Sequence, residues 1–362
     1  MRGARARHHA VGRGVLALSR GATRGRAIVL RALGLGDVLT VVPALRAVRR
    51  GLPDHEVVLA GPTALADLVV APDLVDRVLP ARGLAPLEWD GTPPEVAVDL
   101  HGSGPESHRL LQALRPDRLV GYACPAAGVT GPEWRPGEHE VRRWCRLVEH
   151  AGWPADPSQL RLAPPGVPSP AAGAVVVHPG AAYPSRRWPV GRFAAVASWV
   201  RSQGLDVVVT GSAEEVALAR VVAEAAGLAA GAVLAGLTDL RSLSALVAGA
   251  RLVVSGDTGM AHLATAFGTP SVVLFGPVPP SEWGPPAEGP HTVLWSGGER
   301  AASGGRGDPH GQTVDPALLT TSVEEVIAAA RERLLLNGFG GDRTSGRGPG
   351  GRHAARGAGS GR

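Results

Sequence analysis

Three segments of this chain combine glycine with charged or polar residues, and each directly follows a short apolar run. The first reads Arg-Ala-Leu-Gly-Leu-Gly-Asp over residues 31–37. Its glycines allow the backbone to approach a ligand closely, and the carboxylate of Asp37 stands where it can face a cleft. An acidic residue near a helix N-terminus can instead cap the helix or complement its dipole. This segment alone leaves both interpretations open.

A dinucleotide site is another chemistry to consider for the first segment. The corresponding fingerprint requires Gly-x-Gly-x-x-Gly between a strand and a helix. Here Leu39 occupies the position of the third glycine. Because the spacing fails, an NAD-dependent oxidoreductase is disfavoured.

The second segment, residues 178–189, contains His-Pro-Gly and then two adjacent arginines before Trp188. Arg186 and Arg187 offer planar guanidinium groups that stay charged and donate several hydrogen bonds, which suits a diphosphate. The alternative is a solvated arginine pair beside a packed tryptophan. The segment by itself does not decide between these interpretations.

The third segment, residues 255–264, reads Ser-Gly-Asp-Thr-Gly-Met-Ala-His-Leu-Ala. A strand followed by a glycine-containing turn and a helix start leaves free N–H groups, which bind phosphate with the help of the helix dipole. The hydroxyl of Thr258 and the imidazole of His262, one turn further, can add donors. The alternative is a capping Asp257 with a core-facing histidine. The spacing Asp-Thr-Gly-x-x-His is more specific than either residue alone.

Strands and helices must position these segments, and the hydropathy pattern indicates both. Short apolar runs are typical of strands buried on both faces of a parallel sheet, and we expect them over residues 27–30, 57–60, 78–79, 96–100, 174–177, 207–210, 252–254 and 271–275. Apolar residues at helical spacing predict helices from about residue 37 to 51 and over 64–70, 190–203, 214–226, 240–248, 260–267 and 323–335. The alternation indicates an α/β fold with parallel sheets.

Proline and glycine gather in mid-chain, at residues 163–173, where they break both periodicities. We therefore predict a domain linker there. A chain of 362 residues has room for two domains of ordinary size. We expect one domain over residues 26–165 and another over 166–336, with disordered tails at 1–25 and 337–362.

Composition narrows the function classes further. The net charge of +5 comes from arginines near the two ends, and the stretch between them is mildly acidic, which disfavours a nucleic-acid-binding body. Cys124 and Cys145 lack the short spacing of a metal or redox pair, so we predict no metal site and a reducing compartment. The apolar runs fall far short of the ~20 residues that span a bilayer. We therefore expect a cytoplasmic protein.

In this order, the three segments resemble the glycosyltransferase family 9 pattern, that of the bacterial ADP-heptose:lipopolysaccharide heptosyltransferases. The resemblance covers roughly residues 26–335. It also includes Gly-Asp-Val-Leu-Thr-x-x-Pro-Ala-Leu at 36–45, Asp-Leu-His-Gly-Ser at 99–103, Thr-Gly-Ser-x-Glu-Glu at 210–215, Gly-Leu-Thr-Asp-Leu at 236–240, and Phe-Gly-Pro at 275–277 before Trp-Gly-Pro at 283–285.

The resemblance implies a GT-B architecture, in which two Rossmann-like domains face an interdomain cleft. The first domain would hold the acceptor and the second the nucleotide sugar. Asp37 matches the family's general base, and Arg186 stands where the family has a lysine that contacts the donor phosphates. Glu215 matches a residue that holds the nucleoside. The implied donor-binding set is Arg186, Glu215, Asp257, Thr258, Gly259 and His262, and the implied acceptor-binding set is Arg31, Gly36 and His101.

The activity implied by this resemblance is an inverting, metal-independent transfer of a sugar, with heptose from ADP-heptose as the first expectation. The acceptor would be a hydroxyl of a glycolipid or glycan, and no cofactor is expected. We also expect the protein to contact the inner membrane surface peripherally. We expect no specific nucleic-acid partner. Two alternatives stay open: a GT-B transferase using a UDP-, GDP- or dTDP-hexose for cell-wall or metabolite glycosylation, and a non-catalytic nucleotide- or glycan-binding protein.

Overall fold

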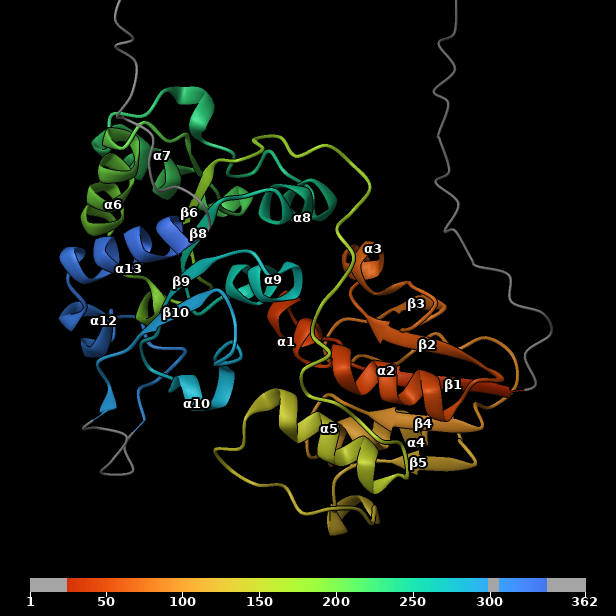
Figure 1. The fold of residues 1–362 in the computed structure, drawn as a ribbon. Coiled ribbons are helices and arrows are strands. Elements are labelled where there is room, and N and C mark those ends of the chain that lie inside the picture. The colour runs from red at the N-terminus through yellow and green to blue at the C-terminus, as the bar shows by residue number, and fades with distance from the viewer. Residues whose placement is uncertain (1–24, 299–305, 337–362) are drawn as a thin grey trace, which may run out of the picture.

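Two parallel five-stranded sheets make up the structure (Figure 1). It is a computed structural model that describes residues 25–298 and 306–336. The expected tails therefore lie outside the described residues, except that Gly25 opens the first strand. Every named strand pair in both sheets is parallel. This architecture confirms the predicted α/β fold with two parallel sheets.

The N-terminal lobe runs from β1 to α5, and its strand order is β3-β2-β1-β4-β5. Its strands are β1 (Gly25–Leu30), β2 (His55–Gly61), β3 (Arg77–Pro80), β4 (Val96–Asp99) and β5 (Arg118–Val120). Its helices are α1 (Leu35–Thr40), α2 (Val42–Gly51), α3 (Ala66–Val69), α4 (Glu106–Gln112) and α5 (Glu140–His150).

The C-terminal lobe runs from β6 to α13, with strand order β10-β9-β8-β6-β7. Its strands are β6 (Val175–His178), β7 (Val207–Val209), β8 (Leu252–Gly256), β9 (Ser271–Leu274) and β10 (His291–Leu294). Its helices are α6 (Val190–Ser202), α7 (Val216–Ala225), α8 (Leu240–Ala248), α9 (Gly259–Phe267), α10 (Pro280–Trp283), α12 (Pro316–Thr320) and α13 (Val323–Leu336).

Helices cover both faces of each sheet, which is why the strands read as continuous apolar runs. In β8, Leu252 and Val254 pack toward α6, α7 and α13, whereas Val253 packs with residues of α8 and α9. In β1, Ala27 and Val29 belong to the core shared with α1 and α2, and the alternate residues pack on the opposite face of the sheet.

One helix was expected from about residue 37 to residue 51, but the structure divides this stretch into α1 and α2 at Val41. Pro43 stands in the first turn of α2, where a missing N–H group costs no hydrogen bond. The helix also begins at Leu35, two residues before the expected start. The break leaves α1 as a separate short helix at the end of β1.

The two lobes share a single apolar core between them. Val38 and Leu39 of α1 belong to the same buried cluster as Met260 and Leu263 of α9. In Figure 1, α1 and α9 lie between the two sheets. Residues 163–173, the expected linker, contain no helix or strand and connect α5 to β6. The chain just before them is fixed to the C-terminal lobe, because the N–H group of Leu162 donates to the carbonyl of Ala266 at 2.8 Å.

Candidate functional site

The N-terminal turns of α1 and α9 meet between the lobes, and glycine makes the approach possible. A methyl group on the α-carbon of Gly36 would lie 2.7 Å from Cδ2 of His262. A methyl group on Gly259 would lie 3.1 Å from Cβ of Leu35. Thr258 begins α9 as its N-cap, and its hydroxyl accepts from the Met260 N–H group at 3.3 Å. The starts of α1 and α9 therefore pack closely against each other at the boundary between the lobes.

Asp37 lies in the first turn of α1, and its side chain is one-third exposed, at 33%. Oδ1 of Asp37 lies 3.3 Å from Nη2 of Arg31, and the Asp37 carbonyl accepts from Nε of Arg31 at 3.0 Å. Arg31 itself is buried, and its guanidinium also donates to the Leu100 carbonyl at 2.6 Å. The structure thus engages the predicted acceptor ligand Arg31 internally, with Asp37 as the member of the pair that is open to a ligand.

His101 follows β4, on the same edge of the sheet as Asp37. Its Nδ1 accepts from the N–H group of Ala32 at 3.3 Å, and its own backbone N–H donates to Asp99 at 2.9 Å. Burial lowers the pKa of His101, while the carboxylates of Asp99 and Asp37 oppose that effect. A neutral His101 whose Nδ1 accepts carries its proton on Nε2. This side chain can therefore donate one hydrogen bond near Asp37.

In the C-terminal lobe, Arg186 ends the short 3-10 turn Pro184–Arg186 that follows β6. Its Nη2 contacts the carbonyl of Asp257 and lies 3.0 Å from the carboxylate Oδ2 of that residue. Asp257 is buried, whereas the Arg186 side chain is 27% exposed. The pair links the loop after β6 to the loop after β8, and it leaves part of the Arg186 side chain exposed.

His262 lies one turn into α9, where it faces α1. Its Nε2 lies 4.0 Å from Oδ1 of Asp257, and the ring of Trp283 packs edge-on with centroids 6.0 Å apart. Burial lowers the pKa of His262, and the charges of Asp257 and Asp37 oppose the shift. The imidazole is therefore neutral near pH 7. The charge of Asp37, which lies in the other lobe, acts on it electrostatically.

Glu215 stands at the carboxyl edge of the second sheet. Its carboxylate accepts from the Ser212 N–H group at 2.9 Å in a capping box. The same carboxylate packs against the α-carbon of Gly180, where an added methyl group would clash with it. Burial lowers the pKa of the neighbouring His178, and the charge of Glu215 opposes that shift. Glu215 thus borders the loop that leads from β6 to Arg186.

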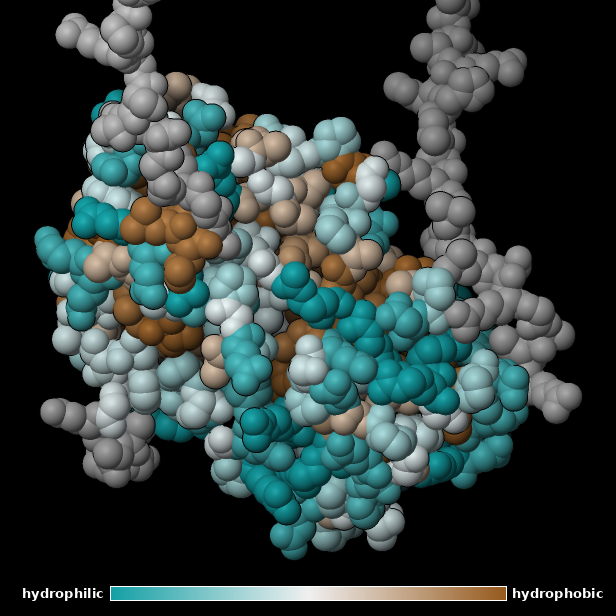
Figure 2. Space-filling model, in the orientation of Figure 1, coloured by the Kyte–Doolittle hydropathy of each residue, from teal (hydrophilic) through white to brown (hydrophobic). Residues whose placement is uncertain are grey.

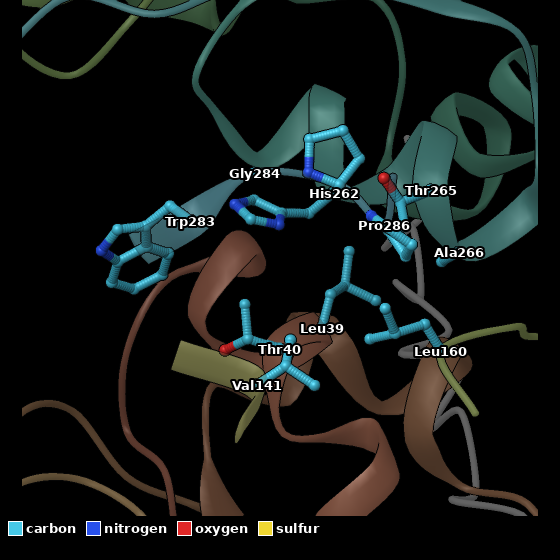
Figure 3. A pocket seen from close by; sticks show the side chains of 11 residues that line it. Leu39, Thr40, Val141, Leu160, His262, Thr265, Ala266, Trp283, Gly284 and Pro286 are labelled. Atoms are coloured by element: carbon cyan, nitrogen blue, oxygen red, sulfur yellow. The ribbon is translucent and has the colours of Figure 1, made fainter. Parts of the chain in front are cut away.

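A small cavity lies between the lobes, beside His262. Figure 3 shows the imidazole of His262 pointing into the space bounded by Trp283, Leu39 and Thr40. The cavity shares Val141, Leu160, Thr265, Pro285 and Pro286 with a groove of about 930 Å³ that is also lined by the start of α5 and by residues 156–161, which precede the linker. Hydrophilic side chains gather over α2 and α5 on that face of the molecule (Figure 2).

Three further residues contribute to the site, and the sequence alone did not assign them a role. Glu140 opens α5 and receives Arg31 at 3.1 Å. His139 caps the same helix, and its Nε2 donates to the carbonyl of Gly284 at 3.0 Å, which ties the two lobes together. Trp283 packs against His262. The Trp-Gly-Pro motif pointed to Trp283 without a role, but a charged residue at a helix start gives no comparable signal for Glu140.

Residues 25–298 and 306–336 contain neither a metal-binding cluster nor a membrane-spanning helix. No three residues among the histidines, cysteines, aspartates and glutamates in these ranges cluster as a metal ion requires. Within the same ranges, no helix combines the length and the apolar character needed to cross a bilayer.

Two parallel-sheet lobes that face each other, with a carboxylate on one side and a guanidinium beside a helix N-terminus on the other, are the architecture of a GT-B glycosyltransferase. The chain belongs to glycosyltransferase family 9 (heptosyltransferase), whose sequence model matches residues 132–312. It is therefore a glycosyltransferase, as the sequence motifs predicted.

Individual relatives agree with this assignment. The chain is 28% identical over 291 residues to lipopolysaccharide heptosyltransferase 1 of Pseudomonas aeruginosa, a match that covers 70% of this chain and 79% of the relative. Its fold is similar to a family 9 glycosyltransferase of Veillonella parvula, with a TM-score of 0.69 at 20% identity over 87% of this chain and 98% of the other. It is also similar to ADP-heptose lps heptosyltransferase II of E. coli, with a TM-score of 0.67 at 18% identity over 86% and 99%.

Proposed function

We propose that this chain transfers heptose from ADP-heptose to a sugar hydroxyl of a lipopolysaccharide precursor, with inversion at the anomeric carbon and without a divalent metal. The relatives' names support the donor and the acceptor class. We assign the acceptor to residues 26–165 and the nucleotide sugar to 166–336. We place the reaction in the cytoplasm, beside the inner membrane surface where such a glycolipid is available.

One observation carries the proposal. Gly36 packs against His262, so the turn that carries Asp37 and the start of α9 meet at the lobe boundary, where the charges of Asp37 and Asp257 both act on His262. A transferase needs a base beside the attacking hydroxyl and positive potential beside the leaving diphosphate at the same time. The two groups lie on different lobes, which suits a reaction between substrates that each lobe binds separately.

Asp37 is the base in this proposal because it is the partly exposed carboxylate on the acceptor side. It accepts the hydroxyl proton while the acceptor oxygen attacks the anomeric carbon and the bond from that carbon to the diphosphate breaks. A single displacement of this kind inverts the anomeric configuration. His101 donates from Nε2 to an acceptor oxygen and helps to orient it.

Arg186 and the N-terminal end of α9 stabilise the diphosphate that leaves. The guanidinium holds a permanent positive charge, and the N-terminus of α9 adds the positive end of its dipole. Neutral His262 adds a hydrogen bond without a second full charge. These groups take the role that a divalent metal has in other phosphate-transfer sites. Glu215 accepts hydrogen bonds from the hydroxyls of the nucleoside.

A donor panel tests the proposal. The purified chain is titrated with ADP-heptose and with UDP-, GDP- and dTDP-hexoses, and then assayed with a heptose-free lipopolysaccharide precursor in the presence of EDTA. We expect binding of ADP-heptose at least about tenfold tighter than the other donors and release of ADP with EDTA present. Preference for another nucleotide identifies the alternative hexosyltransferase, and binding without turnover identifies a non-catalytic protein. Loss of turnover in EDTA contradicts metal independence.

A further inference from the structure

We infer that Arg31 and Glu140 position the carboxylate of Asp37, and that Glu140 sets how strongly the Arg31 charge acts on it. The inference deepens the proposed function, because it rests on Asp37 being the base. It gives a role to Glu140, for which the motifs suggested none, and it gives Arg31 a positioning role in place of direct acceptor contact.

Arg31 lies where four parts of the N-terminal lobe meet: the end of β1, the first turn of α1, the loop after β4 and the start of α5. Its side chain is 1% exposed, directly after β1. Nε donates to the carbonyl of Asp37 at 3.0 Å, and Nη2 lies 3.3 Å from the Asp37 carboxylate and 3.4 Å from the hydroxyl of Thr40. Nη1 donates to the carbonyl of Leu100 at 2.6 Å. A planar fork of donors thereby fixes the first turn of α1 relative to the loop after β4.

Glu140 balances this buried cation from α5. Its Oε1 lies 3.1 Å from Nη2 of Arg31 and accepts from Nε1 of Trp144 at 2.7 Å. Its Oε2 receives Nη1 of Arg143. The Trp144 ring also lies under the Arg31 guanidinium, with the ring centroid 4.9 Å from Cζ, which favours the cation. Glu140 therefore has both oxygens occupied and is not placed to act as a base.

Arg31, Arg143, Asp37 and Glu140 form a cluster with no net charge, and Asp37 is its most exposed member. Arg31, Glu140 and Arg143 have side chains that are 1%, 6% and 9% exposed, whereas Asp37 is 33% exposed. Asp37 and Glu140 share the same Nη2 atom of Arg31. In a buried setting, where charges interact more strongly than in water, the positive potential felt by Asp37 depends on how much of the Arg31 charge Glu140 offsets.

Other groups also face Asp37, from different elements. His262 of α9 and His101 after β4 both feel the Asp37 charge. Burial lowers the pKa of each imidazole, so both are neutral near pH 7. Arg143 pairs with Glu140, so Arg31 and Glu140 are the charged residues of the cluster that act most directly on Asp37. Removing either charge should move the acidic limb of the activity profile, in opposite directions.

The experiment measures kcat and KM against pH for ADP release from ADP-heptose with the heptose-free lipopolysaccharide precursor. Glu140→Gln keeps an acceptor for Trp144 but loses the negative charge, and we expect its acidic limb to move to lower pH by about half a unit or more. Arg31→Gln should move the limb to higher pH. Arg31→Lys keeps the charge but loses the fork, so we expect kcat to fall about 10- to 100-fold with donor KM within about twofold. The matched control is Arg26→Gln, which breaks an ion pair with Glu56 at the other end of β1 and should leave the profile unchanged.

An acidic limb that stays in place in Glu140→Gln overturns the inference, as does an unchanged kcat in Arg31→Lys. Arg31→Gln is the variant most exposed to misfolding, so the decision rests on the other two if it does not fold. Asp37→Asn separates the two levels of the argument. Retained turnover in Asp37→Asn refutes the base itself, whereas loss of turnover there together with wild-type behaviour in Glu140→Gln and Arg31→Lys refutes the positioning alone.

Discussion

The α-carbon of Gly36 packs directly on the imidazole of His262, close enough that a methyl group would stand 2.7 Å from Cδ2. Gly36 precedes Asp37 in the first turn of α1, and His262 lies one turn into α9, after Thr258. This contact joins the two lobes at their boundary. In the proposed mechanism, the distance between Asp37 and the leaving group therefore depends on a contact that leaves no room for a side chain at position 36.

The substitution Gly36→Ala tests that contact. The added methyl group forces the two helix starts apart or displaces His262, and we expect kcat/KM to fall at least about tenfold, or about 1.4 kcal/mol of transition-state stabilisation. The matched control is Gly191→Ala in α6, where an added methyl group meets nothing within 4 Å. Steady-state kinetics on both variants, with unfolding temperatures to confirm the fold, would contradict the account if Gly36→Ala behaved like the control.

Arg186→Ala should weaken ADP binding. Hydrogen bonds to charged groups contribute about 1.5–3 kcal/mol each, so we expect the Kd to rise about 10- to 100-fold. Arg220→Ala, which removes an exposed arginine from α7, is the charge-matched control. Isothermal titration with ADP measures both. Equal affinities for the two variants would remove Arg186 from the phosphate site.

Glu215→Gln should lower the affinity for the nucleoside part of the donor. The glutamine oxygen can still accept from the Ser212 N–H group, so the capping box at 2.9 Å survives while the charge is lost. We expect adenosine-containing ligands to bind about 3- to 30-fold more weakly and inorganic pyrophosphate to bind as before. Glu214→Gln, which changes the exposed neighbour, serves as control. If the variant discriminates between ADP and pyrophosphate as the wild type does, Glu215 does not hold the nucleoside.

Stability should fall in acid through buried histidines, and His291 gives a defined window. Burial lowers its pKa from 6.5 to about 4, and the charges of Arg161 and Arg333 add to the shift. Between those values the unfolded chain binds a proton that the folded chain does not. The stabilisation is therefore complete above pH 6.5 and is lost as the pH falls toward 4. We expect Tm to decline from pH 7 to pH 5, and to decline less in His291→Gln. The same decline in both proteins would exclude His291 as a source.

The strands that could be predicted from sequence are those in which nearly every residue is buried. β1 and β8 are buried on both faces, so each appears as an unbroken apolar run. β10 has only half-buried residues and gave no such run. α5 was not assigned, although Val141, Trp144, Cys145 and Val148 have helical spacing. That helix was within reach of the same reasoning.

Some site residues could likewise be predicted from local sequence patterns, and others could not. Asp37, Arg186 and His262 lie in the loops that follow strands or in the first turns of the helices after them, so parallel topology brings them to the carboxyl edges of their sheets. Glu140 is different, because it reaches Arg31 from 109 residues away. A contact of that kind depends on how α5 packs beside α2, and no local pattern reports it. The burial of Arg31 was missed for the same reason.

In the proposed mechanism, Asp37 is the base that accepts the proton of the acceptor hydroxyl, while the opposite lobe binds the donor. The most direct test is Asp37→Asn, assayed for ADP binding by titration and for ADP release from ADP-heptose with the heptose-free lipopolysaccharide precursor. The account predicts a Kd for ADP within about twofold of wild type and a kcat that is lower by about 10²- to 10⁴-fold. Turnover at the wild-type rate in this variant would contradict it.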